Sequence, residues 1–181
     1  MTNPTTRTLG KDEWMTPDEV FDPVHQELRF EFDAAAGSER ESRLPQFIDP
    51  VTDALGCSWR YFGTRAWLNP PYGRDLGKWF AKATQQVKDG VHLVCMLTYA
   101  NTDTKYWQQY VVENPYCHEV IFLTPRVRFV DPDDTNKSNG APKGSALIIF
   151  RSSFCASLPR HTYWNYKRDP FRAPSPRSNH V

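Results

Sequence analysis

The stretch Ala66-Trp67-Leu68-Asn69-Pro70-Pro71-Tyr72-Gly73 decides the fold, because an apolar strand stops there at a polar, proline-rich turn. An amphipathic helix is predicted after Asp75, which is placed to cap it, and its apolar face comprises Leu76, Trp79, Phe80, Ala83 and Val87. The following run, residues 91–97, is almost continuously apolar, as in a strand that is covered on both faces. A strand, a helix and a second buried strand in this order indicate a parallel α/β unit.

The residues upstream of this unit show the same alternation. Thr16-Pro17-Asp18-Glu19 reads as a capping box, with Thr16 at the N-cap and Pro17 at the first helical position. The helix that follows should be kinked or divided by Pro23, which removes one internal hydrogen bond. A short strand is expected over residues 30–33, running into a turn of small residues, and another at residues 46–48.

Downstream, the patterns predict a helix over residues 102–112 and buried strands over residues 119–123 and 145–150. Strands that alternate with helices indicate an α/β domain with a mostly parallel sheet flanked by helices. In such sheets ligands bind beyond the carboxyl ends of the strands. The loops after Phe32 and Leu68 are therefore the expected ligand-binding edge.

The length of 181 residues fits one domain with short additions. Residues 1–13 are polar and predict a flexible leader, residues 14–156 carry the alternating pattern, and residues 157–181 form a basic, aromatic and proline-rich tail. The polar stretch 130–143 is too long for a simple connection, which predicts a small recognition loop. The tail either follows a phosphate backbone or packs back on the core.

The charge and the cysteine spacing exclude several classes of protein. The net charge of +1 excludes a strongly basic chromatin-type protein, but the local charge changes from −6 in residues 1–50 to +5 in residues 151–181, so one face can meet a polyanion. The 4 Cys and 5 His have no metal-ligand spacing, so no metal site is predicted and the cysteines are expected to be buried free thiols. No window approaches the roughly 18 apolar residues of a membrane span, which predicts a cytoplasmic protein without a membrane partner.

Asn69-Pro70-Pro71-Tyr72 offers two hydrogen-bond acceptors and a flat ring at the end of a strand. One acceptor is the Asn69 side-chain oxygen and the other is the Pro70 carbonyl, since the prolines fix the backbone and add no competing N–H group. Two converging acceptors suit an exocyclic amine with its two N–H donors, and Tyr72 can stack on the heterocycle that carries the amine. The alternative is that these residues form a rigid turn that only ends the strand. Because the motif lies at the expected ligand-binding edge, we favour a role in ligand binding or catalysis.

This motif resembles the catalytic motif of S-adenosylmethionine-dependent amino-methyltransferases, and the wider chain resembles the phage-type DNA N6-adenine methyltransferase (Dam) family. The resemblance covers about residues 13–150 in the family's order, which makes it more specific than four residues alone. The matching segments are Trp14-Met15-Thr16-Pro17, Phe30-Glu31-Phe32-Asp33-Ala34-Ala35-Ala36, Asp53-Ala54-Leu55, Trp67-Leu68-Asn69-Pro70-Pro71-Tyr72-Gly73, Lys78-Trp79, Thr102-Asp103-Thr104-Lys105, Arg126-Val127-Arg128-Phe129 and Gly140-Ala141-Pro142.

The resemblance implies a Rossmann-like S-adenosylmethionine-dependent methyltransferase fold. It also implies transfer of a methyl group from that cofactor to N6 of an adenine that is flipped out of DNA. The implied catalytic motif is Asn69, Pro70, Pro71 and Tyr72. The implied cofactor-binding residues are Thr16, Pro17, Asp33, Ala35, Glu39, Asp53 and Asn69. The basic residues that bracket the long polar loop are candidates for DNA contacts: Arg126, Arg128, Lys137 and Lys143.

Within the cofactor set, the resemblance places Thr16-Pro17 beside the methionine end and Asp53 beside the adenine amine. Asp33 is expected to accept hydrogen bonds from the amino group or the ribose of the cofactor. The chain departs from the family pattern at Arg40, where Asn is frequent, so the ribose-binding acid stays open, with Glu39 as the candidate. It departs again at Lys143, where an aromatic residue is common.

Two other functions remain open at this point. A protein methyltransferase acting on a glutamine amide shares the Asn-Pro-Pro-Tyr motif and the cofactor, but the basic tail and the absence of a substrate-recognition domain argue against it. A non-catalytic DNA-binding relic of the fold is the second, favoured by the departure at Arg40. The expected partner is DNA, taken as double-stranded, and the chain is expected to be a monomer or a weak dimer.

Overall fold

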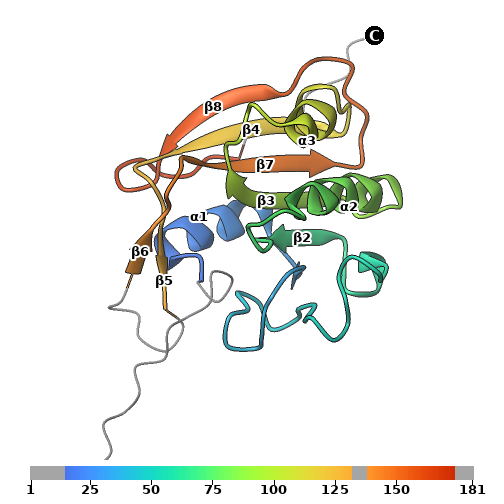
Figure 1. The fold of residues 1–181 in the computed structure, drawn as a ribbon, viewed down its shortest axis with the longest axis horizontal. Coiled ribbons are helices and arrows are strands. Elements are labelled where there is room, and N and C mark those ends of the chain that lie inside the picture. Colours follow the sequence, from blue (N-terminus) through green and yellow to red (C-terminus); the bar gives the residue numbers. More distant parts are fainter. Residues whose placement is uncertain (1–14, 132–137, 174–181) are drawn as a thin grey trace, which may run out of the picture.

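The computed structural model describes residues 15–131 and 138–173. Its centre is a six-stranded sheet in the order β1-β2-β3-β7-β4-β8, whose strands β2 to β8 lie from bottom to top in Figure 1. Only β7 runs against the other five strands, so the predicted mixed α/β fold with a largely parallel sheet is confirmed. The strands are β1 Phe32–Asp33, β2 Arg65–Leu68, β3 Leu93–Tyr99, β4 Cys117–Thr124, β7 Ser145–Arg151 and β8 Arg160–Asn165.

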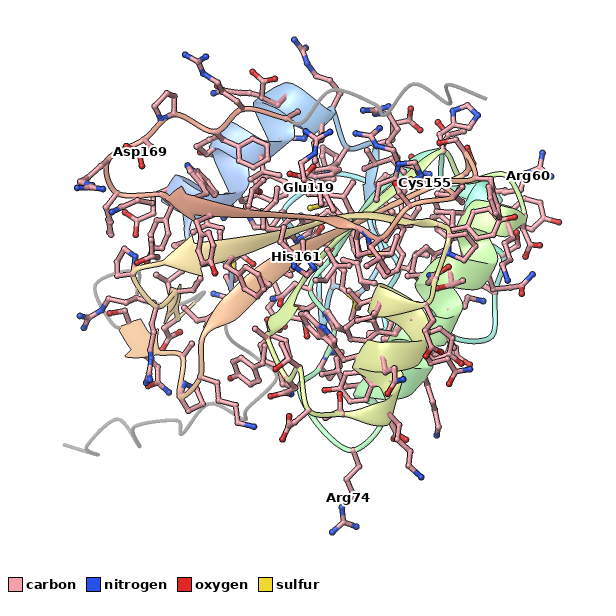
Figure 2. The ribbon with its side chains drawn as sticks, turned by 90° about the horizontal axis from the view of Figure 1, so that it is seen from above. Arg60, Arg74, Glu119, Cys155, His161 and Asp169 are labelled. Atoms are coloured by element: carbon pink, nitrogen blue, oxygen red, sulfur yellow. The ribbon has the colours of Figure 1, made fainter. Side chains whose placement is uncertain are left out.

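Helices cover both faces of the sheet, and α1 lies on the opposite side from α2 and α3 (Figure 2). The alternation of side chains along β3 shows how the sheet separates two cores, because Cys95 packs on the α1 side while Val94 and Met96 pack on the side of α2 and α3. The helical elements are α1 Asp18–Leu28, a 3₁₀ turn η1 at Trp59–Tyr61, α2 Leu76–Lys88, α3 Lys105–Trp107 and a π-helical turn η2 at Gln108–Val112 that continues α3. None of these helices is long and apolar enough to cross a bilayer within the part of the chain that is described.

Helix α1 differs from its prediction at its N-terminus. The N-cap is Pro17 rather than Thr16, and no side chain caps the helix. The Thr16 hydroxyl is buried without a hydrogen-bond partner among the described residues, so it is not used as a cap. The helix also runs through Pro23 without division, because its buried face, which includes Phe21 and Val24, holds it against the sheet.

The remaining predicted elements occur with shifted bounds. Asp75 is at the N-cap of α2, but its carboxylate pairs with Lys78 and does not cap the helix. Residues 46–48 form an isolated bridge beside β1 at Phe47 rather than a strand. The predicted helix over residues 102–112 is capped by Thr104 and changes from α to π geometry after Trp107.

The stretch 130–143 is not a structureless loop. Its flanks form a hairpin of β5 Arg128–Val130 and β6 Ser138–Gly140, which pair in antiparallel fashion. Val130 also exchanges two backbone hydrogen bonds with Met15, so the hairpin is held against the start of the described chain. The tip of the hairpin and the predicted leader 1–13 lie outside the described residues.

The basic segment after residue 156 is part of the domain up to residue 173. Strand β8 pairs in parallel with β4 along six residues, and the side chains of Trp164, Tyr166 and Phe171 are buried against the α1 face of the sheet. Lys167 pairs with Glu19 of α1. Of the two alternatives for the residues after 156, packing back on the core is the one observed up to residue 173, since their aromatic side chains join the core on the α1 face.

Candidate active site

The carboxyl ends of β1, β2 and β3 meet at one edge of the sheet, because these three strands are parallel neighbours. Asp33 is the last residue of β1 and is paired in register with Trp67 of β2. Asn69 follows β2 directly, and Tyr99 ends β3. The predicted ligand-binding edge thus brings Asp33 and the Asn-Pro-Pro-Tyr motif onto adjacent strands.

The Tyr72 side chain folds back over Asn69. Its hydroxyl donates a hydrogen bond to the Asn69 Oδ1 at 2.9 Å and also lies 3.4 Å from the Leu97 carbonyl. The Tyr72 ring packs on Tyr99, with ring centroids 4.3 Å apart, and meets the edge of Phe129 of the hairpin at 5.9 Å. The motif is therefore fixed by aromatic contacts from two other elements, β3 and β5.

Burial raises the pKa of Tyr72 well above its usual value, since a phenolate would lose its hydration there. The hydroxyl consequently stays protonated and remains a donor at neutral pH. The Asn69 oxygen that accepts from it has two lone pairs, so one acceptor position stays available to a ligand. Pro70 is buried and Pro71 exposed, which places the rigid turn at the surface of the edge.

A pocket opens beside Asn69, between the β1 loop and the start of α1. The pocket is small and partly open, with a volume of about 30 Å³, so it takes a small polar group and any larger ligand extends along its open side. The residues that line it are Met15, Thr16, Asp33, Ala35, Ala36, Gly37, Glu41, Arg43, Trp67 and Asn69. Four of the predicted cofactor residues are among them: Thr16, Asp33, Ala35 and Asn69.

Asp33 is a buried carboxyl at the wall of this pocket. It accepts backbone hydrogen bonds from Ala35 at 3.2 Å and from Arg43 at 3.1 Å, one on each oxygen. Burial nevertheless raises the pKa of Asp33 from 3.8 to about 6, because desolvation outweighs these two donors. A buried carboxylate with spare lone pairs, facing a pocket, suits a cationic ligand group.

The pocket walls also contain polar atoms that nothing in the described chain satisfies. Thr16 Oγ1, Arg43 Nε and Trp67 Nε1 are each buried without a hydrogen-bond partner in residues 15–131 and 138–173. Most buried polar groups in folded proteins are hydrogen-bonded, so buried groups without a partner are rare. Thr16, Arg43 and Trp67 line the pocket together with Asp33, so its wall combines donor-bearing side chains with an acidic one, residue types that suit the zwitterionic amino-acid end of S-adenosylmethionine.

Three predicted cofactor residues do not line the pocket. Pro17 begins α1, where its carbonyl accepts from Val20 and Phe21. Glu39 is exposed on the loop, and it is Glu41 that lines the pocket and accepts from Ser38 at 3.0 Å. Asp53 is exposed at positive φ, and its carboxylate accepts from the backbone of Leu55, as an ordinary turn-capping aspartate does.

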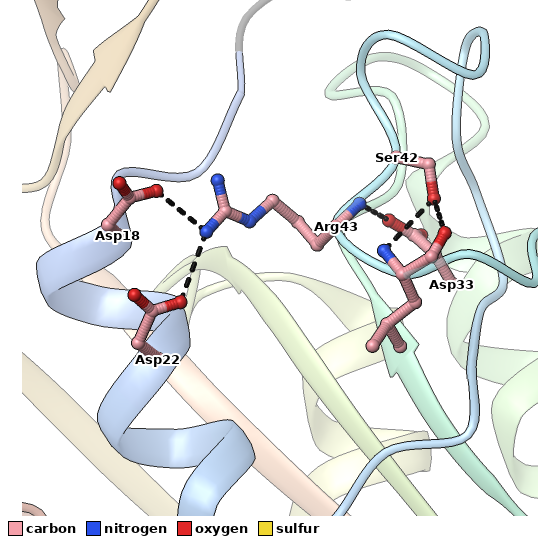
Figure 3. A network of polar contacts seen from close by, with 6 residues as sticks. Asp18, Asp22, Asp33, Ser42 and Arg43 are labelled. Atoms are coloured by element: carbon pink, nitrogen blue, oxygen red, sulfur yellow. Dashed lines mark hydrogen bonds and ion pairs between the residues drawn. The ribbon is translucent and has the colours of Figure 1, made fainter.

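Arg43 and Trp67 were missed as site residues. The sequence does contain information on Trp67. Side chains alternate between the two faces of a strand, so Trp67 of β2 lies on the α1 face of the sheet while Leu68 lies on the other face. Arg43 has no such signal, because it belongs to an irregular segment. Only the folded chain places its backbone N–H on Asp33 and its guanidinium beside Asp18 and Asp22 of α1 (Figure 3).

Three of the candidate DNA-binding residues, Arg126, Arg128 and Lys143, lie at the base of the hairpin. Arg128 is exposed on β5. Arg126 donates to the Pro142 carbonyl at 3.0 Å, and Lys143 donates to Asn101 at 3.0 Å, so both take part in internal contacts across the hairpin base. Lys137 lies outside the described residues. Because Phe129 of the same hairpin contacts Tyr72, the hairpin that carries these basic groups lies against the Asn-Pro-Pro-Tyr motif.

Comparison with known proteins decides among the functions that the residues left open. The family described as DNA N-6-adenine-methyltransferase (Dam) matches residues 3–169, which is most of the chain. A comparison with curated proteins returns no match. The matched range extends through β8, in agreement with its place in the sheet. The chain belongs to the Dam family of DNA N6-adenine methyltransferases, enzymes that use S-adenosylmethionine as methyl donor.

Proposed function

We propose that the enzyme holds a flipped-out adenine at Asn69-Pro70-Pro71-Tyr72, with the amine on two acceptors and the ring against Tyr72. The observation that carries this proposal is the position of Asn69, which lines the pocket and is also within hydrogen-bond reach of Tyr72. A residue that touches both the cofactor pocket and the aromatic platform stands where the two substrates meet. The adenine must leave the duplex, because base pairing and stacking otherwise block access to its N6 amine.

The chemistry assigned to these residues is orientation and polarisation of the amine. When bound, the cofactor supplies an electrophilic methyl group on a sulfonium. The Asn69 oxygen and the Pro70 carbonyl each accept one amine hydrogen, which draws electron density towards N6 and directs its lone pair to the methyl carbon. Fixing two reactants in this way supplies much of an enzyme's rate.

Tyr72 has two functions in this arrangement. One face of its ring is packed on Tyr99, and the opposite face is assigned to the base. Stacking on an aromatic side chain contributes about 1–3 kcal/mol per base. Its hydroxyl, hydrogen-bonded to Asn69 Oδ1, turns the amide so that its oxygen rather than its NH₂ group stays at the acceptor position.

The fold is assigned to the Rossmann-like methyltransferases. Parallel strands β1, β2 and β3 support this assignment, since their carboxyl ends carry the pocket on one side and the catalytic motif next to it. Thr16, Asp33, Ala35 and Asn69 are proposed to contact the cofactor. Glu41 replaces Glu39 as the candidate for the ribose, because Glu41 lines the pocket.

The hairpin β5–β6 is proposed to meet double-stranded DNA beside the flipped base. Arg126, Arg128 and Lys143 are exposed at its base, and arginine suits guanine edges while lysine suits phosphates. Arg74, two residues past Tyr72, projects into solvent from the loop before α2 (Figure 2) and joins this set as a phosphate contact. The enzyme is expected to act in the cytoplasm, that of the host cell if the gene is carried by a phage.

Single-turnover methylation of DNA tests the roles of the motif. Asn69→Ala and Tyr72→Ala should each slow transfer by about a hundredfold or more, as loss of one positioned group in an active site commonly does. Tyr72→Phe keeps the stacking face and should retain most of the rate. Tyr61→Ala is the matched control, since Tyr61 is exposed on η1. If either alanine variant keeps the wild-type rate in a folded protein, the assigned roles are wrong.

A further inference from the structure

We propose that the exposed aromatic face of β4 and β8 binds unpaired nucleotides of the DNA beside the target adenine. Tyr163 of β8, packed on Phe122 of β4, stacks on a base, and Lys143 contacts the phosphate chain. The preferred substrate is then DNA in which a single-stranded segment follows the target duplex. This inference rests on the proposed function, since an adenine held at Tyr72 fixes the edge of the sheet that the DNA follows.

The helices of the α2 face leave the outer part of the sheet uncovered. Helix α2 packs on β3 and β7, and η2 packs on β4, but no helix lies over the ends of β4 and β8 on the side of the hairpin (Figure 1). The effect on exposure is large. Ala146 and Ile148 of β7 are fully buried in the core of this face, whereas Tyr163 is 79% exposed and His161 beside it is also exposed.

Tyr163 and Phe122 form a cross-strand aromatic pair on this face. They are partners in the register of β4 and β8, and their ring centroids lie 5.3 Å apart. Phe122 is half-buried against the core under α2, and the ring of His161 meets its edge at 5.9 Å. The Tyr163 ring is therefore supported on one side and open on the other. A supported aromatic ring with an open face stacks on any base, because every base has a π face.

The aromatic pair lies within reach of DNA that is bound at the catalytic motif. Phe122 is in register with the start of β7, which is in register with Tyr99, the residue packed on Tyr72. Strands β8 and β3 are separated by β4 and β7, and three strand spacings of about 4.8 Å amount to about 14 Å. That distance is about four nucleotide steps, at roughly 3.4 Å per step of a stacked strand. One DNA molecule can therefore contact Tyr72 and Tyr163 together.

Two exposed cations lie between the aromatic pair and the catalytic motif. Lys143, just before β7, donates to Asn101, which in turn donates at 2.9 Å to the hydroxyl of Tyr106 in α3, so the ammonium lies on the α3 side of the sheet. Arg126, just after β4, donates to the backbone carbonyl of the residue before Lys143. Glu119, the one carboxylate in the described strands β4 and β8, is buried. An aromatic surface bordered by cations is typical of proteins that bind single strands, where bases stack and cations follow the phosphates.

This chemistry favours an unpaired base over a paired one. Bases inside a duplex are stacked on their neighbours, so a protein ring stacks only on a base that has left the helix or was never paired. The enzyme already needs one adenine to leave the duplex, and that step costs least where the DNA is single-stranded. An unpaired segment held at Tyr163 therefore favours the same opening that the catalytic motif requires.

Two DNA probes that differ only in an unpaired segment test the surface without catalysis. One is a short blunt duplex, and the other is the same duplex with an overhang of about eight thymidines, within the usual site sizes of single-strand-binding folds. Fluorescence anisotropy of a dye on the duplex measures the dissociation constant with the full chain. The wild type should bind the overhang probe about tenfold more tightly, as expected for one stacked base.

Tyr163→Thr should remove this preference and leave the affinity for the blunt duplex unchanged, whereas Tyr163→Phe should keep it. Threonine is a good strand former, and a melting curve checks that the variant is folded. Lys143→Gln should lower the slope of log Kd against log salt concentration by about 0.7 for the overhang probe, as for one phosphate contact with a single strand. Phe154→Thr is the matched control, because Phe154 is 56% exposed and packs on Tyr116, before the amino end of β4.

The outcomes separate the surface from the function on which it rests. The surface is wrong if folded Tyr163→Thr keeps the preference for the overhang, or if Phe154→Thr loses it equally. A wild-type dimer in analytical ultracentrifugation that Tyr163→Thr converts to a monomer would show that a second copy covers the face, which also overturns the proposal. If the wild type methylates plasmid DNA but binds both probes equally, the surface is wrong and the proposed function stands. If it prefers the overhang through Tyr163 but methylates no adenine, the proposed function fails and the DNA-binding surface stands.

Discussion

Cofactor affinity should depend on pH through Asp33, and the structure gives both the direction and the size of the effect. Burial raises the pKa of Asp33 from 3.8 to about 6. The carboxylate, not the acid, is the form that accepts from the ammonium of the ligand. Protonation of Asp33 below pH 6 therefore competes with binding, and affinity should fall as the solution becomes more acidic.

The magnitude follows from the fraction of Asp33 that is ionised. With a pKa of about 6, roughly nine-tenths of the carboxyls are ionised at pH 7 and roughly one-tenth at pH 5. The dissociation constant for S-adenosylhomocysteine should therefore rise about tenfold between pH 7 and pH 5. The ligand-free protein has the opposite trend, because the folded chain binds more protons than the unfolded chain between the two pKa values, so this group's contribution destabilises the fold as pH rises from about 4 to about 6.

Isothermal titration calorimetry at pH 5, 6 and 7 measures this dependence. In buffers of different ionisation enthalpy, binding at pH 5 should release close to one proton and binding at pH 7 almost none. Asp33→Asn should bind weakly with a flat pH profile, and 5′-methylthioadenosine, which has no ammonium, should be insensitive to pH with the wild type. A constant affinity for S-adenosylhomocysteine from pH 5 to 7 in the wild type would refute the placement of Asp33 against the ammonium.

Three further predictions concern DNA and stability. Arg128→Ala should relax the target preference at one position in a randomised DNA library, at a cost of about 1–3 kcal/mol, whereas Arg126→Ala should lower methylation of all sequences alike; unaltered preference in both variants would place specificity elsewhere. Trp164→Ala should destabilise the protein by about 3–5 kcal/mol in urea unfolding, since β8 belongs to the core, and a value near zero would mean that the segment is a dispensable tail. Gln86→Ala removes the side-chain oxygen that accepts from the buried backbone N–H of Trp59 at 2.7 Å. It should lower the free energy of unfolding by about 1–3 kcal/mol in the same assay.

Much of the fold could be predicted because its local patterns agree with its topology. The apolar run of β3 is the pattern of a parallel strand that is buried on both faces. The change from apolar to polar residues at Asn69 marks the carboxyl end of β2. The loop after β1 was predictable because it also follows the carboxyl end of a parallel strand, and Asp33, the last residue of β1, lines the pocket. Such residues are specified by the strand they end, so a short window of sequence contains the information.

The missed features depend on contacts between distant segments. The local sequence around Thr16 predicts a helix N-cap. In the fold, its hydroxyl is buried and caps no helix, and the residue lines the pocket. Arg160 to Asn165 read as a basic tail because alternating charged and aromatic residues also suit an edge strand, whose partner β4 is about 40 residues upstream. Arg43 acquires its partners only when α1 packs beside the β1 loop.

The central claim is that this chain methylates N6 of adenine in DNA through Asn69. The most direct measurement incubates the purified protein with S-adenosylmethionine labelled in its methyl group and with plasmid DNA, alongside Asn69→Ala, and then sequences the DNA for N6-methyladenine. The account predicts label in the DNA, at adenines within a common short sequence, with the wild type and a loss of about a hundredfold or more with the variant. Label found in protein rather than DNA, on a base other than adenine, or at equal levels with Asn69→Ala would contradict it.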